Sequence, residues 1–135
     1  MRITADTNIL VRIIVRDDVA QAEAALDLLE KAEMVFIPLP CLCEFAWILD
    51  TTYRLPREMI ARSLRGIASR ANVAVERTEV TAGLRVLDAG GDFADGAIAA
   101  AGALMGAGTF VSFDRKAVAH IKAAGMSAEL ARAST

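Results

Sequence analysis

Short apolar runs alternate along this chain with longer stretches in which apolar residues recur every three or four positions. The short runs have the character of strands buried on both faces, and the longer stretches have helical periodicity. The pattern predicts strands at residues 2–5, 34–38, 73–76 and 109–113, with a weak edge strand near 128–131. It predicts helices at residues 7–16, 19–33, 39–53, 56–70, 78–89, 92–106 and 115–124.

Proline and glycine support several of these boundaries. Pro40 and Pro56 lie at the start of two predicted helices, where a missing backbone N–H costs nothing. Gly90 and Gly91 follow a predicted helix, the position that glycine favours because it tolerates a left-handed turn. The helix boundaries are therefore expected to follow these residues.

Strands that alternate with helices indicate a parallel sheet, because parallel strands need crossover connections. The predicted fold class is α/β: a three-layer α/β/α sandwich with a mostly parallel sheet of four to five strands. A length of 135 residues suits a single domain spanning 1–135. In such sheets, ligands collect at the carboxyl ends of the strands.

Composition and charge limit the function classes. The formal net charge is −2, so the chain lacks the broad basic field of proteins that hold nucleic acid by charge alone. Any nucleic-acid contact is expected to be local or assisted by a metal. A group of arginines offers either a local phosphate-binding stripe or a solvated helix face: Arg54, Arg57, Arg62, Arg65 and Arg70.

Other signals argue against zinc, secretion and a membrane. Cys41 and Cys43 with a single histidine cannot complete a zinc ligand set, and both are expected to be buried thiols in a reducing compartment. No basic leader precedes Asp6, so a cytoplasmic location is expected. The uncharged stretch 96–113 is interrupted by two glycines and is expected to form a buried helix and a buried strand, not a membrane span.

Two acids share one local context. Asp6 and Asp114 each follow a predicted strand and precede a helix, which places both carboxylates at the carboxyl ends of strands. Either acid alone has an equally good explanation as a helix N-cap.

Glu44 is the one charged residue within the apolar stretch 41–49. We expect it to be buried and to need a distant partner, because an unpaired buried carboxylate costs several kcal/mol. The alternative is a glutamate that reaches solvent at the rim of the helix.

Asp92 and Asp95 lie three residues apart at a predicted helix start, with Asp92 expected to cap the helix and Asp95 to face the strand ends.

Carboxylates that converge on one crevice repel one another unless a cation joins them. A hard divalent ion, Mg²⁺ or Mn²⁺, prefers such oxygen ligands, and its characteristic chemistry at this position is phosphodiester hydrolysis. The single histidine, His120, is expected to be a surface or satisfied residue, not a catalytic one.

Four segments together resemble PIN-domain ribonucleases, and most closely the VapC-type toxins of toxin–antitoxin modules: "ADTNIL", "CEFAWIL", "GGDFADGAIAA" and "TFVSFDRKA". The similarity extends from residue 3 to about residue 124. It implies an endoribonuclease that uses Mg²⁺ or Mn²⁺, acts on tRNA or rRNA sites, forms a homodimer and is silenced by a VapB-like antitoxin. Trp47, Phe45 and the third predicted helix are the candidate dimer anchors.

The resemblance assigns the family's four acids to Asp6, Glu44, Asp95 and Asp114, as catalytic and metal-binding residues. Accessory roles fall on four further positions, namely Thr7, Asn8, Asp92 and Ser112. Gly96 stands where many relatives carry alanine, and it is expected to loosen its helix slightly without removing a ligand.

Three other readings of the same acids remain. A PIN-type nuclease could serve RNA maturation or act on DNA structures. A catalytically silent, acid-lined module could dock a basic partner segment. A phosphoacceptor receiver domain fits less well, because Lys116 follows Asp114 inside a helix and does not end a strand.

Overall fold

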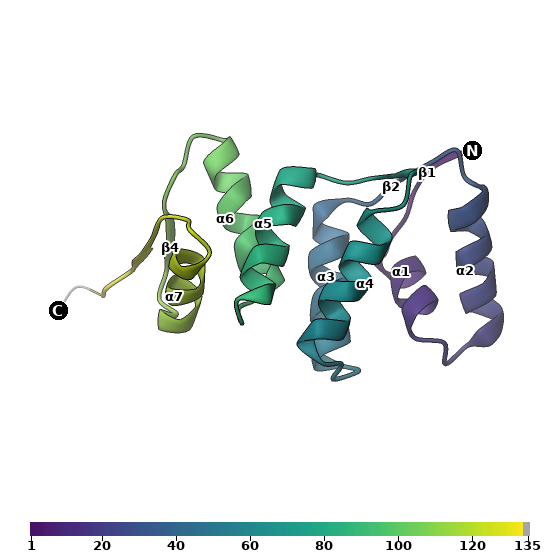
Figure 1. The fold of residues 1–135 in the computed structure, drawn as a ribbon, viewed down its shortest axis with the longest axis horizontal. Coiled ribbons are helices and arrows are strands. Elements are labelled where there is room, and N and C mark those ends of the chain that lie inside the picture. The colour runs from purple at the N-terminus through teal and green to yellow at the C-terminus, as the bar shows by residue number, and fades with distance from the viewer. Residues whose placement is uncertain (134–135) are drawn as a thin grey trace. The chain divides into compact units, whose positions relative to one another are not determined.

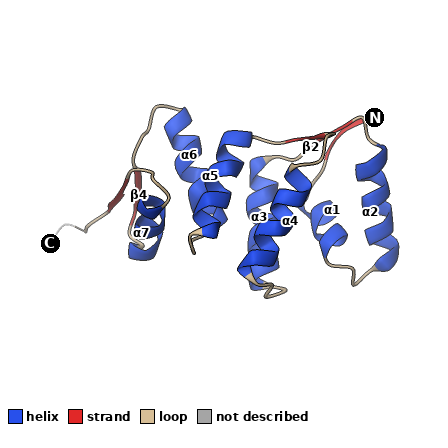
Figure 2. Ribbon diagram, in the orientation of Figure 1, coloured by secondary structure: helices blue, strands red, loops and turns tan. Residues whose placement is uncertain are grey.

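The computed structural model describes residues 1–133, and its internal contacts divide the chain into two compact units, Met1–Glu76 and the part from Arg77 on. Helices dominate both units and the strands are short (Figures 1 and 2). The first unit contains β1 (Arg2–Thr4), α1 (Thr7–Ile14), α2 (Val19–Lys31), β2 (Met34–Phe36), α3 (Leu39–Thr51), α4 (Arg57–Ala68) and β3 (Val73–Ala74). The second contains α5 (Arg77–Asp88), α6 (Phe93–Leu104), β4 (Phe110–Ser112), α7 (Arg115–Ala123) and β5 (Ala128–Leu130).

The first unit is built on a parallel sheet in the order β1-β2-β3. Ile3 pairs with Val35, and Val35 pairs with Val73. The pairing continues past the strand ends, because the backbone N–H of Ala5 donates to the carbonyl of Phe36 at 3.0 Å. Helix α1 packs against α2 and α3, and α3 packs against α4. Fully buried side chains from the sheet and from these helices form the core: Val35, Ile37, Leu10, Leu42, Phe45, Leu49 and Leu64.

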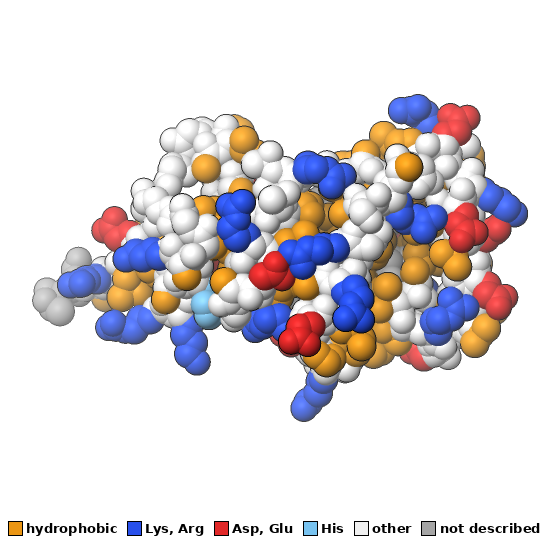
Figure 3. Space-filling view, in the orientation of Figure 1, with side chains coloured by type: hydrophobic (Ala, Val, Ile, Leu, Met, Phe, Trp, Pro, Cys, Tyr) orange, Lys and Arg blue, Asp and Glu red, His pale blue; other side chains and the backbone are white. Residues whose placement is uncertain are grey.

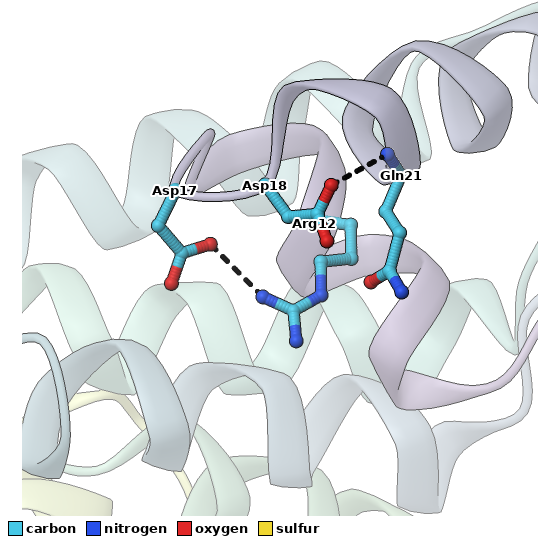
Figure 4. A network of polar contacts seen from close by, with 4 residues as sticks. All are labelled: Arg12, Asp17, Asp18 and Gln21. Atoms are coloured by element: carbon cyan, nitrogen blue, oxygen red, sulfur yellow. Dashed lines mark hydrogen bonds and ion pairs between the residues drawn. The ribbon is translucent and has the colours of Figure 1, made fainter.

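A polar corner joins α1 to α2 (Figure 4). The guanidinium of Arg12 contacts the Asp17 carboxylate at 2.9 Å, and Asp18 caps α2 by accepting from the backbone N–H of Gln21 at 3.0 Å. An exposed ion pair of this kind contributes about 0–1 kcal/mol, and the cap contributes about 1 kcal/mol. The cap therefore stabilises the start of α2 at least as much as the ion pair does.

The second unit combines a tight helix pair with a parallel two-stranded sheet, in which Val111 pairs with Glu129. Helices α5 and α6 approach closely at two glycines. A Cβ atom at Gly83 would lie 2.7 Å from the Phe93 ring, and one at Gly96 would lie 2.6 Å from the carbonyl oxygen of Ala82. Gly96 is thus required for helix packing, a role that the sequence did not predict.

The α/β class, the parallel pairing and the order of the elements are as the sequence predicts. The number of strands per sheet differs from the predicted single sheet of four to five strands. Among residues 1–133, the hydrogen-bonded strands form a three-stranded sheet in the first unit and a two-stranded sheet in the second. Whether the chain is one domain stays a prediction.

Burial at the end of the second unit also differs from expectation. The stretch 109–113 was predicted to be a buried strand, yet Val111 is 58% exposed and Phe113 is 73% exposed. Helix α6 is buried only on one side, with Ile98 and Leu104 exposed on the other. In the part of the chain that the structure describes, no helix has the length and apolar character needed to cross a bilayer.

Candidate active site

Asp6 lies just past the carboxyl end of β1 and is the N-cap residue of α1. One carboxylate oxygen accepts a hydrogen bond from the backbone N–H of Ile9 at 3.2 Å. The side chain is exposed. The cap therefore fixes the orientation of the carboxylate while its second oxygen stays available to a ligand.

The two polar residues after Asp6 have different surroundings. Thr7 is buried in the first turn of α1, and Asn8 is exposed. A side chain that must contact a substrate or a bound water needs access to solvent. Of the two accessory positions, Asn8 is the one on the surface of the first unit.

Glu44 lies in the middle of α3 and is exposed, so the expected burial is wrong. The apolar residues around it in sequence are divided between two faces of the helix. Phe45 is completely buried, whereas Trp47 is 62% exposed. Phe45 is therefore excluded as a dimer anchor, and Glu44 shares the solvent-facing side of α3 with Trp47.

The cysteines on α3, Cys41 and Cys43, are not joined in a disulfide, and both are partly buried instead of fully buried. The arginine group is mostly on the surface. Arg54, Arg57, Arg62 and Arg65 are exposed, and Arg70 is half-buried.

Asp92 and Asp95 occupy the start of α6 as predicted. Asp92 is the N-cap, and one of its carboxylate oxygens accepts from the backbone N–H of Ala94 at 3.3 Å. Asp95 lies in the first turn and is half-buried. Each carboxylate also interacts favourably with the positive end of the helix dipole.

Asp114 lies two residues after the end of β4, with Phe113 between them, and it is the N-cap residue of α7. A single carboxylate oxygen accepts from the backbone N–H groups of Lys116 at 2.9 Å and Ala117 at 3.3 Å. The backbone N–H of Asp114 itself donates to the hydroxyl of Ser112 at 3.0 Å. Ser112 thus supports the turn that presents Asp114, and its accessory role stays a prediction.

The acids of the second unit influence one another electrostatically. Burial raises the pKa of Asp95 above its ordinary value of 3.8, and the negative charges of Asp92 and Asp114 raise it further. His120 acts in the opposite direction and lowers the pKa of Asp95. Asp92, Asp95, Asp114 and His120 form what we call the α6–α7 cluster.

His120 lies close enough to Asp95 to affect its pKa, although its position in an apolar helix suggested a surface or satisfied residue with no part in the site. Its side chain packs on the turn before α6, where a Cβ atom at Gly91 would lie 2.8 Å from the His120 Cβ. Nothing in the local sequence of α7 marks this contact. The pair Gly90 and Gly91 was the available signal, because consecutive glycines often admit a close neighbour.

The structure therefore gathers Asp92, Asp95 and Asp114 in the second unit, and Asp6 and Glu44 lie in the first. Across residues 1–133 it forms no group of three or more Asp, Glu, His or Cys side chains arranged to hold one metal ion. The meeting of all four predicted acids at one site stays a prediction.

Comparison with known families identifies the chain. The PIN domain family matches residues 3–123, which includes all four acids. This chain belongs to the PIN domain family. The helix-rich α/β fold with parallel sheets is consistent with the three-layer α/β/α architecture of PIN domains. No curated protein matches the chain.

PIN domains are generally nucleases, hydrolases that act on RNA or DNA, and they typically use divalent metal ions. The carboxylates of this PIN domain are the residues with the right chemistry for that ion. Oxygen ligands suit Mg²⁺ and Mn²⁺, which take one or two carboxylates directly and complete their shell with water and phosphate oxygens.

Proposed function

We propose that this PIN domain is a Mg²⁺- or Mn²⁺-dependent endoribonuclease that acts as the toxin of a type II toxin–antitoxin module. The observation that carries the proposal is the family match over residues 3–123, which spans Asp6, Glu44, Asp95 and Asp114 in order. Its proposed partners are an RNA substrate, a VapB-like antitoxin and a second copy of the chain, with a cytoplasmic location.

The α6–α7 cluster supports a role for a divalent ion. Asp92 and Asp114 both disfavour the ionised form of Asp95, and the histidine beside them offsets this only in part. A carboxylate held among other carboxylates gains most from a cation that binds all of them. The support comes from the chemistry of these oxygen donors, which a hard divalent ion prefers, and not from a preformed metal site among residues 1–133.

In the proposed mechanism Asp6, Asp95 and Asp114 would hold the ion, and the chemistry that it would supply there is activation of a water and charge neutralisation at a phosphate. Glu44 would position the attacking water or accept its proton. Asn8 on α1 is available to orient a phosphate or a water. Ser112 keeps the Asp114 turn in place through its 3.0 Å hydrogen bond, and Asp92 serves as an accessory acid.

The test is RNA cleavage by an Asp6→Asn variant with Asp18→Asn as its matched control. Asp18 caps α2 as Asp6 caps α1, each accepting a backbone N–H three residues on, and asparagine caps a helix as well as aspartate does. Both variants should keep the fold of the parent. We expect Asp6→Asn to cut RNA at least about 100-fold more slowly in Mn²⁺, and Asp18→Asn to match the parent.

A growth assay separates the toxin from its rivals. Expression of the parent chain should arrest growth and expression of Asp6→Asn should not, whereas a maturation nuclease should leave growth unchanged in both cases. Equal RNA cleavage by the parent and Asp6→Asn would overturn the assignment of Asp6. Binding of Mn²⁺ without any cleavage of RNA or DNA would favour the silent binding module.

A further inference from the structure

Trp47 is the one tryptophan in the sequence, and its side chain is largely in solvent. Tryptophan is usually well buried because its large apolar surface is costly to hydrate. Trp47 lies on α3 three residues after Glu44, so the two side chains share a face of the helix one turn apart. An indole on the surface beside a proposed catalytic acid needs an explanation.

The exposed residues one turn from Trp47 on α3 are polar, which argues against the centre of a protein interface. Glu44, Asp50 and Thr51 are its exposed neighbours at helical spacing. The core of a protein–protein interface is a contiguous apolar patch depleted of charge. An isolated indole among polar residues instead fits a platform on which a flat ligand stacks.

A hollow continues the same face of α3 beyond Trp47. It measures about 410 Å³ and is lined by Asp50, Thr51, Arg54 and Leu55. Thr51 lies four residues after Trp47, about 6 Å further along the helix axis. The hydroxyl of Thr51 already donates to the carbonyl of Trp47 at 2.8 Å, so Arg54 is the side chain in the hollow that can donate to an anion.

Arg54 occupies an unusual backbone position. Its φ is +52°, and the turn closes where the N–H of Leu55 donates to the carbonyl of Leu49 at 2.9 Å. Glycine is the usual residue at this point of a helix end, because other residues are strained there. A guanidinium is thus present in the hollow at some cost to stability.

Charge alone gives this chain little affinity for RNA, since its net charge is −2. Figure 3 shows a face on which acidic side chains lie among the basic ones. Base stacking on an aromatic ring adds affinity without a basic field, and it is available to any sequence of single-stranded RNA.

We infer that the indole of Trp47 is a stacking platform for a base of single-stranded RNA and that Arg54 binds a flanking phosphate. The inference rests on the proposed function, because it supplies the substrate contact beside Glu44. It assigns a nucleobase subsite and a phosphate subsite to the exposed face of α3 and the turn that follows it.

The test uses the intrinsic fluorescence of the parent chain of 135 residues, in whose sequence Trp47 is the only tryptophan. A short, mixed-sequence single-stranded oligoribonucleotide is added in EDTA and, separately, in Ca²⁺, so that binding is read without relying on cleavage. Stacking should quench the emission in a saturable way.

Four variants separate stacking from general damage to the fold. Trp47→Ala should weaken RNA binding, followed by the anisotropy of a labelled oligoribonucleotide, by about 5- to 150-fold per stacked base. Trp47→Phe, which keeps a ring, should recover most of that affinity. Leu28→Ala, at another exposed apolar residue of the first unit, should bind RNA as the parent does. Arg54→Gly should unfold at a higher temperature yet bind RNA more weakly, with a salt dependence reduced by about one phosphate contact.

The outcomes are distinct from those of the cleavage test. If Trp47→Ala binds RNA as tightly as the parent, or if RNA binds and the emission is unchanged, the inference is wrong even if RNA is cleaved. Emission that changes with protein concentration alone, with RNA affinity unaffected by Trp47→Ala, would identify the face as a contact between copies of the chain. RNA that quenches Trp47 but is never cut in Mn²⁺ would support the inference and contradict the nuclease proposal.

The kinetics of RNA cleavage give a further readout. Trp47→Ala should raise KM and leave kcat nearly unchanged.

Discussion

Asp6, Asp92 and Asp114 each use one carboxylate oxygen to cap the helix that follows. A cap fixes two side-chain torsions through a backbone hydrogen bond, and the other oxygen keeps its lone pairs for a ligand. Capping and metal binding are thus compatible in one residue. The sequence leaves open whether Asp6 and Asp114 are helix caps or site residues. One aspartate can have both roles.

Asp95 differs from these caps because its ionised form is disfavoured in the folded protein. A carboxyl whose folded-state pKa is raised holds its proton more tightly when folded, so the protein loses stability as the pH rises from 3.8 through the raised value. Asp95→Asn removes that loss. We expect the variant to be more stable than the parent at neutral pH, with the difference disappearing below pH 3.8.

Thermal unfolding in EDTA across this pH range measures the effect. An Asp95→Asn variant that is less stable than the parent at neutral pH would mean that the ionised carboxylate has a partner in the folded chain. The same variant is expected to lose nuclease activity, which would make Asp95 a residue that gains function at the expense of stability.

Local signals predict the capping acids, because a cap depends on a few adjacent residues. They could not predict the exposure of Glu44. Helix α3 is apolar over most of its length, so its buried face cannot be read from the sequence, and only the packing of α3 on α1 and α4 places Phe45 inside and Trp47 outside. The same packing puts Glu44 in solvent.

At the scale of elements, the contact of α5 with α6 depends on two glycines. A methyl group at Gly96 would meet the backbone of α5, which cannot move aside as a flexible side chain can. We expect Gly96→Ala to destabilise the protein by about 1–3 kcal/mol, despite the better helix propensity of alanine. Chemical denaturation of the purified variant measures this.

Gly66 provides the matched control, because it lies inside α4 and a Cβ atom there would meet nothing within 4 Å. Gly66→Ala should stabilise the protein by about 0.5–1 kcal/mol. If both substitutions stabilise the protein, the inference that Gly96 is required for the packing of α5 on α6 is wrong.

The boundaries of these elements were largely predictable, and their contacts were not. Pro40, Pro56 and Gly90 act within one or two residues, so the helix ends fall near the predicted positions. The requirement for glycine at position 96 comes from Ala82 on a different helix. A single sequence does not reveal that two residues on different helices, such as Gly96 and Ala82, are in contact.

For the whole molecule, the proposed metal site requires carboxylates from both units. An ion that binds only the folded state stabilises it by about 2.7 kcal/mol when its concentration is 100 times its Kd. We therefore expect Mn²⁺ to raise the unfolding temperature of the parent. The shift should be smaller in Asp6→Asn and in Asp95→Asn, because each variant removes one carboxylate ligand.

A shift that Asp95→Asn reduces and Asp6→Asn leaves intact would contradict a shared site and assign the ion to the α6–α7 cluster alone. Asp18→Asn serves again as the control for the removal of a capping charge. These measurements test whether Asp6 and Asp95 share one ion without relying on any nuclease assay.

The alternation of strands and helices was sufficient to predict parallel pairing and the α/β class, since crossover helices leave few other arrangements. It did not predict that the strands pair as three and two, because strands of two or three residues carry too little pattern to specify their neighbours.

Parallel pairing also affects how the chain is made. Strands β1 and β2 each pair with a strand that lies two helices further along the chain, as Ile3 pairs with Val35 and Val35 with Val73. During synthesis on the ribosome, β1 therefore emerges with nothing to pair with, and the sheet can close only after β3 has left the exit tunnel. We expect β1 to pair with β2 once β2 has emerged, so the interval in which a strand lacks its downstream partner covers the synthesis of α1 and α2 for β1, and of α3 and α4 for β2.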